Sequence, residues 1–194
     1  MHRVILILIS LVSSPLRAQE PSRAAMLLQN AHSQVGKTLL YDPAYAALAF
    51  PGGDVPIERG VCSDVIVRAY RAIGVDLQVL VNKDMHAAFD AYPKVWGLSR
   101  PDPNIDHRRV LNLAMFFTRH GKVLAVSKEA RDYKGGDIVT WRLPDGRPHI
   151  GLVSSRQDGG RPRIVHNIGA GTQVEDISFA FEITGHYRFQ LDAN

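Results

Sequence analysis

The chain has 194 residues, of which 45% are hydrophobic, 22% charged and 8% aromatic. This composition is typical of a globular protein and excludes a disordered, collagen-like or disulfide-knotted chain. The formal charge of +4 falls to +2 when Arg3 and Arg17 of the N-terminal segment are left out. Because the remaining charge is near neutral, we expect no polybasic surface and no nucleic-acid partner.

Residues 1–18 have the pattern of a secretory signal peptide. Arg3 precedes an apolar run over residues 4–12, and Leu16-Arg17-Ala18 supplies a small-residue cleavage site. The run is too short to span a bilayer, which takes about 20 apolar residues, and no other stretch approaches that length. We therefore expect an exported protein without a membrane span, with a single domain over residues 19–194.

The predicted elements place helices first and strands second along the chain. Apolar residues at helical spacing predict four helical segments, the first capped by Ser22: residues 21–35, 62–73, 82–91 and 112–120. An ordered loop rich in turn formers covers residues 39–60. Strand patterns, with turns at 144–146 and 158–160, cover residues 137–143, 149–154, 163–168 and 186–191. This segregation predicts an α+β fold in which N-terminal helices pack on a C-terminal antiparallel sheet.

Cys62 is the single cysteine of the chain, so it cannot form an internal disulfide in an exported protein. The count alone favours a packed thiol, since free cysteine is among the most buried residue types. The first turn of the helix over 62–73 favours a nucleophile instead, because free N–H groups and the helix dipole lower a thiol pKa there. Asp64 in the same turn either faces the sulfur and raises that pKa, or satisfies backbone N–H groups.

Two histidines are candidates for a catalytic base and the group that orients it. His149 begins one predicted strand and His166 lies in the next. A hairpin centred between Gln157 and Asp158 places the two imidazoles opposite each other on one sheet face, with Cβ atoms about 5 Å apart. A polar pair on a solvated face is the alternative interpretation. A register slip of one residue would make Asn167 the third member instead.

The sequence offers candidate groups for a substrate but no metal-binding pattern. No two histidines have the spacing that metal hydrolases use, and we expect neither a metal nor another cofactor. Arg108 and Arg109 follow Asp106-His107 in a loop rich in proline and asparagine. Guanidinium groups bind carboxylates bidentately, so these two arginines are candidates for holding a substrate carboxylate.

Several short stretches follow one another in an order that is found in a known group of enzymes. They are Tyr41 with Pro51-Gly52-Gly53, Gly60-Val61-Cys62-Ser63, Gly136-Asp137-Ile138-Val139, His149-Ile150-Gly151 and Ile164-Val165-His166-Asn167. In order and spacing they resemble the NlpC-type papain-like cysteine peptidases of bacterial cell walls. Three further stretches resemble a narrower branch of that clan, the exported bacterial family called domain of unknown function 1287: Arg59-Gly60-Val61-Cys62-Ser63-Asp64, Asn104-Ile105-Asp106-His107-Arg108-Arg109 and Val165-His166-Asn167-Ile168-Gly169-Ala170-Gly171.

The resemblance implies a papain-like fold with Cys62 as nucleophile, His149 as base and His166 as its orienting partner. It also implies that Tyr41 borders the acyl site. Two positions depart from the clan: Val61 replaces the common aspartate before the cysteine, and Asp64 replaces a small residue. We expect Asp64, like the two arginines, to contribute to substrate binding. The segment over 82–133 is longer than the clan's minimal core and is expected to reshape the cleft.

The resemblance also implies an activity. It is that of an exported cysteine hydrolase, periplasmic or secreted by a bacterium, which cleaves an amide bond in peptidoglycan or a related cell-envelope peptide through a thioacyl-enzyme. The expected partner is therefore a cell-wall peptide or muropeptide, and a monomer is the default state. Two alternatives stay open: a non-catalytic peptide-binding module on the same fold, and an acyltransferase that uses the same Cys–His pair.

Overall fold

The computed structural model describes residues 20–191. The predicted signal peptide, residues 1–18, lies outside the described residues. Four α-helices occupy the first two thirds of the chain: α1 (Arg23–Ser33), α2 (Cys62–Arg71), α3 (Leu77–Ala87) and α4 (Val110–His120). Three short 3-10 turns accompany them: η1 (Phe89–Ala91), η2 (Asp106–Arg108) and η3 (Ala130–Asp132).

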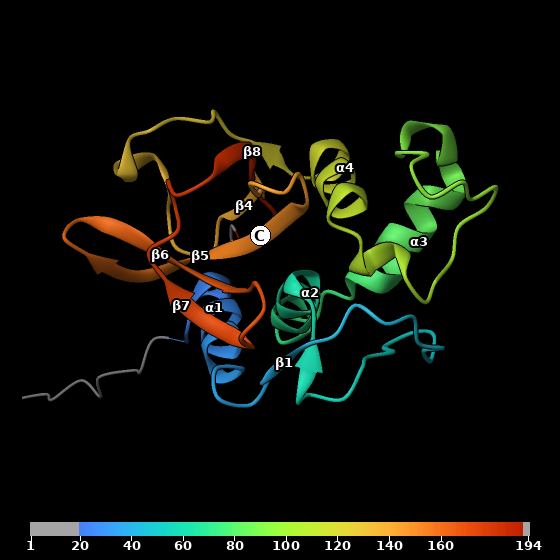
Figure 1. Ribbon diagram of the computed structural model, residues 1–194, viewed down its shortest axis with the longest axis horizontal. Helices are drawn as coiled ribbons and strands as arrows, with labels where there is room; N and C mark the ends of the chain where they lie inside the picture. Colours follow the sequence, from blue (N-terminus) through green and yellow to red (C-terminus); the bar gives the residue numbers. More distant parts are fainter. Residues whose placement is uncertain (1–19, 192–194) are drawn as a thin grey trace, which may run out of the picture.

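Most of the strands form one antiparallel sheet, built from segments between residues 122 and 188. The sheet has six strands in the order β3-β8-β4-β5-β6-β7. Their bounds are β3 (Lys122–Val123), β4 (Ile138–Arg142), β5 (Pro148–Asp158), β6 (Arg161–Asn167), β7 (Thr172–Glu175) and β8 (Glu182–Arg188). A separate parallel pair joins β1 (Leu40–Tyr41) to β2 (Arg59–Gly60). The predicted α+β class, with helices packed on an antiparallel sheet, is confirmed (Figure 1).

The first helix begins where the sequence predicts. The Ser22 hydroxyl accepts a hydrogen bond from the Ala25 N–H at 3.2 Å, which satisfies one of the free donors of the helix start. The third helix begins earlier than predicted, because Asp76 caps it by accepting from the Gln78 N–H at 3.0 Å. The predicted segment at 82–91 is therefore wrong at both ends: α3 starts at Leu77 and ends at Ala87.

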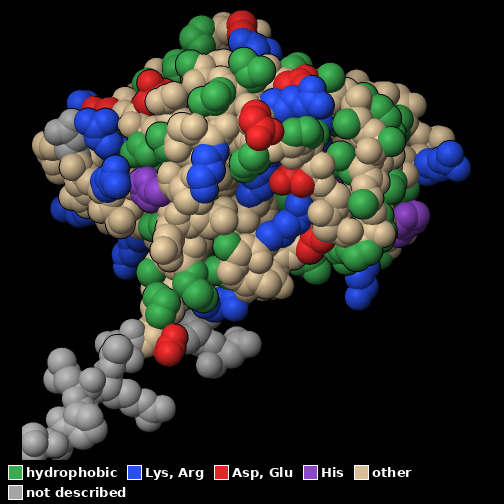
Figure 2. Space-filling view, turned by 90° about the horizontal axis from the view of Figure 1, so that it is seen from below, with side chains coloured by type: hydrophobic (Ala, Val, Ile, Leu, Met, Phe, Trp, Pro, Cys, Tyr) green, Lys and Arg blue, Asp and Glu red, His purple; other side chains and the backbone are tan. Residues whose placement is uncertain are grey.

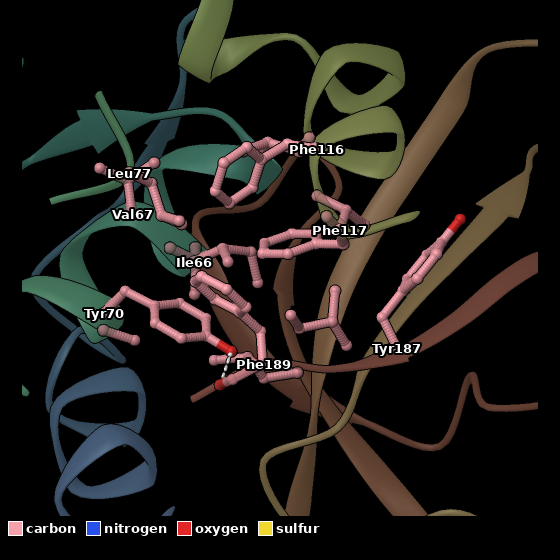
Figure 3. Packing of buried hydrophobic residues seen from close by; sticks show 14 of the residues in the cluster. Ile66, Val67, Tyr70, Leu77, Phe116, Phe117, Tyr187 and Phe189 are labelled. Carbon is pink, nitrogen blue, oxygen red and sulfur yellow. Dashed lines mark hydrogen bonds between the residues drawn. The ribbon is translucent and has the colours of Figure 1, made fainter. Parts of the chain in front are cut away.

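The core lies between the helices and the sheet, and α2 is its central helix. Ile66 and Tyr70 of α2 face Phe117 of α4 and the residues Tyr187 and Phe189 at the end of the chain (Figure 3). The Tyr70 hydroxyl donates to the Phe189 carbonyl at 3.0 Å, and the two ring centroids are 5.8 Å apart. Burial of each such side chain stabilises the fold by roughly 1.5–3 kcal/mol. This packing holds the N-terminal end of α2 rigidly against β5 and β6.

The hairpin between β5 and β6 has a different register from the predicted one. A two-residue turn at Gly159 and Gly160 closes it, and both glycines have positive φ, 55° and 80°, as a type I′ turn requires. Leu152 pairs with Val165, and the register shifts between Val153 and Gln157. The expected direct opposition of the two histidines is therefore wrong by two residues. A shift of two leaves both side chains on the same face, because side chains alternate with period two.

Two surface properties bear on function. On the face shown in Figure 2, basic and acidic side chains are interspersed, which agrees with the near-neutral charge of the domain. Within residues 20–191, no helix has both the length and the apolar character needed to cross a bilayer.

Candidate active site

Cys62 is the first residue of α2, and Asp64 fixes the backbone in front of it. The Oδ2 atom of Asp64 accepts a hydrogen bond from the Val61 N–H at 2.7 Å. Of the two alternatives that the sequence left open, Asp64 therefore satisfies a backbone donor. The same carboxylate forms a bidentate ion pair with Arg108, with both N–O distances at 2.9 Å.

The Asp64–Arg108 pair is buried and fastens the helix start to its surroundings. Arg108 also donates to the carbonyl groups of Ala44 and Asp42, at 3.1 and 3.2 Å. The Ser63 hydroxyl donates to the Arg108 carbonyl at 2.6 Å. Four of the five guanidinium N–H groups are thus engaged by the protein. Asp64 and Arg108 hold the backbone at Cys62, and we do not retain them as the substrate ligands that the sequence suggested.

The two candidate histidines are in direct contact. His149 Nε2 lies 3.0 Å from His166 Nδ1, and the two rings are nearly perpendicular, at 81°. Both side chains are buried. Asn167, the alternative third member, has other partners, because it donates to the Gly60 carbonyl at 3.0 Å and accepts from the Gly169 N–H at 3.2 Å. His166, and not Asn167, is therefore the side chain that contacts His149.

Gly151 makes room for this contact. A Cβ atom at Gly151 would lie 2.5 Å from Ile164 Cγ2 and 3.2 Å from His166 Cβ. The glycine of the His149-Ile150-Gly151 motif is thus explained by the close approach of β6, which brings His166 over the middle of β5.

Cys62 and His149 line one cavity of about 360 Å³. The backbone N–H of Ile150, next to His149, lowers the pKa of the Cys62 thiol, so β5 supplies both the imidazole and a group that acts on the sulfur. Most of the remaining lining is apolar or aromatic, and the charged side chains that line it within residues 20–191 are arginines. The lining residues are Tyr41, Pro43, Val61, Cys62, Trp96, Ile105, Arg108, Arg109, Val110, Leu143, Arg147, Pro148, His149 and Ile168.

Burial keeps the thiol and the imidazole uncharged at neutral pH. Cys62 is only 3% exposed, and burial raises its pKa to about 12. The Asp64 carboxylate acts in the same direction, while the Ile150 N–H opposes it. Burial lowers the pKa of His149 to about 3, helped by His166 and Arg147. The predicted lowering of the thiol pKa at the helix start is therefore wrong, because burial outweighs the helix terminus.

Tyr41 lines the same cavity as Cys62. In the parallel pair of β1 and β2, Tyr41 is opposite Gly60, two residues before Cys62. Burial raises the pKa of its phenol to about 12. The hydroxyl therefore keeps its proton at neutral pH and is available as a hydrogen-bond donor in the cavity.

Arg109 is held at the cavity wall by two contacts. Its Nη1 atom donates to Asp106 Oδ1 at 3.1 Å, and its guanidinium lies over the Trp96 ring, 4.2 Å from the centroid. Sequence reasoning missed Trp96, for which no local pattern pointed to the site. It also missed Arg147, which pairs with Asp145 at 2.6 Å and whose place directly before Pro148 and His149 was the available signal.

Sequence reasoning also missed Glu175. Its Oε2 atom lies 2.9 Å from His166 Nε2, so that three side chains from β5, β6 and β7 form one chain of contacts: His149, His166 and Glu175. The signal was the turn at 169–171, because a strand returning from it must run beside β6. No group of three or more His, Cys, Asp or Glu side chains in the described part of the chain is arranged to hold a metal ion.

The fold corresponds to that of a known class of proteins. NlpC1 of Trichomonas vaginalis has the same fold, with a TM-score of 0.50 and 14% identity over 89% of this chain and 46% of that one. A protein of Staphylococcus aureus subsp. aureus Mu50, described as similar to lipoprotein of the NLP/P60 family, matches with a TM-score of 0.43 and 14% identity over 94% of this chain and 46% of that chain. This chain thus spans just under half of each. The fold is an α+β papain-like fold of the NlpC type.

Within that class, the chain belongs to the family described as "Domain of unknown function (DUF1287)", whose model matches residues 28–189. A relative in Escherichia coli (strain K12), "Uncharacterized protein YijF", is 55% identical over 167 residues, which cover 84% of this chain and 80% of that protein. The predicted family and its clan are confirmed.

Proposed function

We propose that this chain is an exported thiol hydrolase that cleaves an amide bond in peptidoglycan or a related cell-envelope peptide. One observation carries the proposal: the hydrogen-bonded His149–His166 pair adjoins a cavity that Cys62 also lines. A thiol with an imidazole base, itself oriented by a third group, is the arrangement that acyl transfer through a thioester needs. The NlpC-type fold supports the same class of chemistry.

In the proposed reaction, His149 Nδ1 accepts the Cys62 proton while the sulfur attacks the amide carbon and forms a C–S bond. Nδ1 has this role because Nε2 is engaged by His166. The C–N bond then breaks, the proton passes from His149 to the leaving amine, and a thioester remains. Water, deprotonated by His149, attacks the thioester, releases the carboxylic acid and restores the thiol.

The uncharged resting pair decides how the first step proceeds. Because burial disfavours both the thiolate and the imidazolium, Cys62 and His149 do not form a thiolate–imidazolium ion pair before substrate binds. Proton transfer is instead coupled to C–S bond formation, when negative charge moves from sulfur to the carbonyl oxygen. The backbone N–H of Cys62, free of an intrahelical partner at the helix start, and the protonated phenol of Tyr41 are the donors proposed for that oxygen.

The charges of the cavity wall indicate an anionic substrate. The described side chains that line it include three arginines and no aspartate or glutamate. Arg108 is enclosed by Asp64 and two carbonyl groups, whereas Arg109 and Arg147 each pair with one carboxylate, that of Asp106 and that of Asp145, and we propose that these two meet a ligand. The Nη1 atom of Arg109 donates to Asp106, and the plane of the guanidinium lies over Trp96. The remaining edge of the guanidinium is the part that we propose binds a carboxylate.

The proposed location is the bacterial periplasm or the cell exterior. It rests on the signal-like pattern of residues 1–18. Fractionation of cells that produce the full chain tests it. Mature protein found only in the cytoplasmic fraction would refute the location.

The activity test uses the purified mature chain with defined muropeptides, followed by mass spectrometry of the products. The protein should release an amine and a carboxylic acid fragment, and the Cys62→Ala and His149→Asn variants should not. His86→Asn is the matched control, since His86 is exposed on α3, away from the cavity. Equal product from the Cys62→Ala variant and the parent protein would refute the nucleophile.

A binding module without catalysis is the second candidate, and the burial and raised pKa of Cys62 favour it. The two candidates differ in a covalent step. A peptide with an activated ester in place of the amide should leave an acyl group on Cys62 of an enzyme, detectable as a mass increase. A binding module would retain the same peptide without forming that adduct.

A further inference from the structure

We propose that Glu175 is a positioning residue: acting through His166, it fixes the proton of His149 on Nε2 and keeps Nδ1 free to act as the base. The inference rests on the proposed function, in which His149 deprotonates Cys62. It adds a residue that no sequence motif in this chain marked.

The strand register brings Glu175 to His166. Within the hairpin of β6 and β7, His166 pairs with Gln173 and Ile164 pairs with Glu175. Glu175 is two residues from Gln173, so its side chain is on the same face as that of His166 and diagonal to it. Its Oε2 atom lies 2.9 Å from His166 Nε2. The Glu175 side chain is 47% exposed, whereas His166 is fully buried, so the carboxylate reaches from the solvent edge to an enclosed imidazole.

The chemistry of the three groups sets the direction of each proton. The Glu175 carboxylate is negatively charged and lies 2.9 Å from His166 Nε2, so its field favours the His166 tautomer that carries a proton on that nitrogen. In a neutral imidazole, Nδ1 of His166 is then a lone-pair acceptor. It can face His149 Nε2 at 3.0 Å only if that atom bears a proton. Nδ1 of His149 is therefore left unprotonated, as a base requires.

Both imidazoles are neutral in this arrangement, so each ring has one protonated and one unprotonated nitrogen. Burial lowers the pKa of His149 to about 3 and also lowers that of His166, although Glu175 opposes the second shift. The Oε2 atom lies off the axis of the His166 N–H, so the contact is electrostatic and not an aligned hydrogen bond. The field of the carboxylate still favours a proton on the nearer nitrogen.

Without the carboxylate, the reversed pair becomes available. His166 then donates from Nδ1 to His149 Nε2, and the proton of His149 moves to Nδ1, where it blocks the acceptance of the Cys62 proton. A glutamine at position 175 promotes this reversal, because its amide NH₂ donates to His166 Nε2. An aspartate keeps the charge on a shorter side chain and should restore part of the original arrangement.

The test reads the tautomers directly, in the protein without substrate. Long-range ¹H–¹⁵N spectra distinguish a protonated from an unprotonated ring nitrogen, and the signals are assigned with His149→Asn and His166→Asn variants. The parent protein should show His149 protonated on Nε2. Glu175→Gln should shift His149 wholly or partly to the Nδ1-protonated form, and Glu175→Asp should return it part of the way. Glu182→Gln is the matched control, since Glu182 is an exposed glutamate on β8 of the same sheet.

Turnover of a cleavable peptide gives the second readout. Removing the carboxylate that holds the imidazole tautomer in serine proteases lowers turnover by about 10⁴. Since Glu175 acts through one more ring, we expect Glu175→Gln to lower kcat by roughly 10-fold to 100-fold with KM unchanged. The Glu182→Gln variant should keep the parent kcat.

The outcomes separate this inference from the proposed function. The same His149 tautomer in the parent protein and in Glu175→Gln would overturn the role of Glu175, whatever the activity. A tautomer change in a protein that cleaves no peptide would support the role of Glu175 and refute the hydrolase instead.

Discussion

Replacing Gly151 with alanine should disturb the fold and the candidate site together. The added Cβ would lie 2.5 Å from Ile164 Cγ2, a distance that packed carbon atoms do not tolerate, and 3.2 Å from His166 Cβ. Overpacking of this kind destabilises a core by about 1–3 kcal/mol. For a domain of this size, the melting temperature falls by about 2–4 °C per kcal/mol, which gives a decrease of roughly 2–12 °C.

The same substitution should reduce activity by more than the lost stability explains. β6 must move away from β5 to accept the methyl group, and His166 moves with it, which breaks the 3.0 Å contact with His149. Thermal denaturation reports the loss of stability, and peptide turnover measured well below the melting temperature reports the loss of activity separately. Gly135→Ala is the matched control, because its Cβ would lie 3.2 Å from the flexible end of Leu28 and at an ordinary contact distance of 3.4 Å from the Ser155 backbone.

A double-mutant cycle with Ile164→Ala tests the reason for the loss. That change removes the Cγ2 atom that a Cβ at Gly151 would strike, so Gly151→Ala should be less destabilising in the Ile164→Ala background. Coupling between contacting residues is typically 0.5–3 kcal/mol. If Gly151→Ala destabilises both backgrounds equally, the close approach of the two strands is not the cause, and the reasoning fails.

Three further predictions concern charge. Burial raises the pKa of Cys62 to about 12, so the stability from this group is complete below the unfolded thiol pKa of about 8.5 and is lost as pH rises toward the folded value. Iodoacetamide should therefore modify the native protein at pH 8 more slowly than the urea-unfolded chain. Half-maximal modification below pH 7 would contradict this prediction. Arg108→Ala leaves the Asp64 carboxylate buried without its partner and should lower the free energy of unfolding, measured in urea titrations, by about 3–5 kcal/mol. Arg131→Ala, at an exposed ion pair, should lower it by about 0–1 kcal/mol. Similar losses for the two variants would count against a buried ion pair. Arg109→Gln should raise KM about tenfold or more for a peptide with a free carboxylate but not for its amidated form, and an equal effect on both peptides would exclude recognition of the carboxylate.

The sequence predicted the facing histidines for the right physical reason but with the wrong register. Alternation along two strands places His149 and His166 on one face whenever the hairpin shift is an even number of residues. The turn at Gly159 and Gly160 lies two residues later than the predicted centre, and the register shift between Val153 and Gln157 cancels half of the resulting difference. The net difference at the histidines is two residues, so both side chains keep their face. Bulges depend on how a strand bends over the helices below it, and no local pattern fixes them.

Contacts between distant segments were harder to predict. Arg108 binds Asp64 across 44 residues of sequence, and the carbonyl groups of Asp42 and Ala44 complete its shell. From the sequence, Arg108 looks like an exposed loop arginine suited to a ligand. Its true partners follow only from the packing of η2 against the start of α2.

The sequence by itself determined the helices, most of the sheet and the shared face of His149 and His166, because these depend on local spacing, caps and turn residues, and its motifs identified the family. Only the tertiary structure decided the charge state of the thiol, the partners of Arg108 and the contact of Glu175 with His166. Those depend on how much water the packed chain excludes from each group and on which distant segments meet there. Burial and long-range contact are properties of the whole fold, and no short stretch of sequence records them.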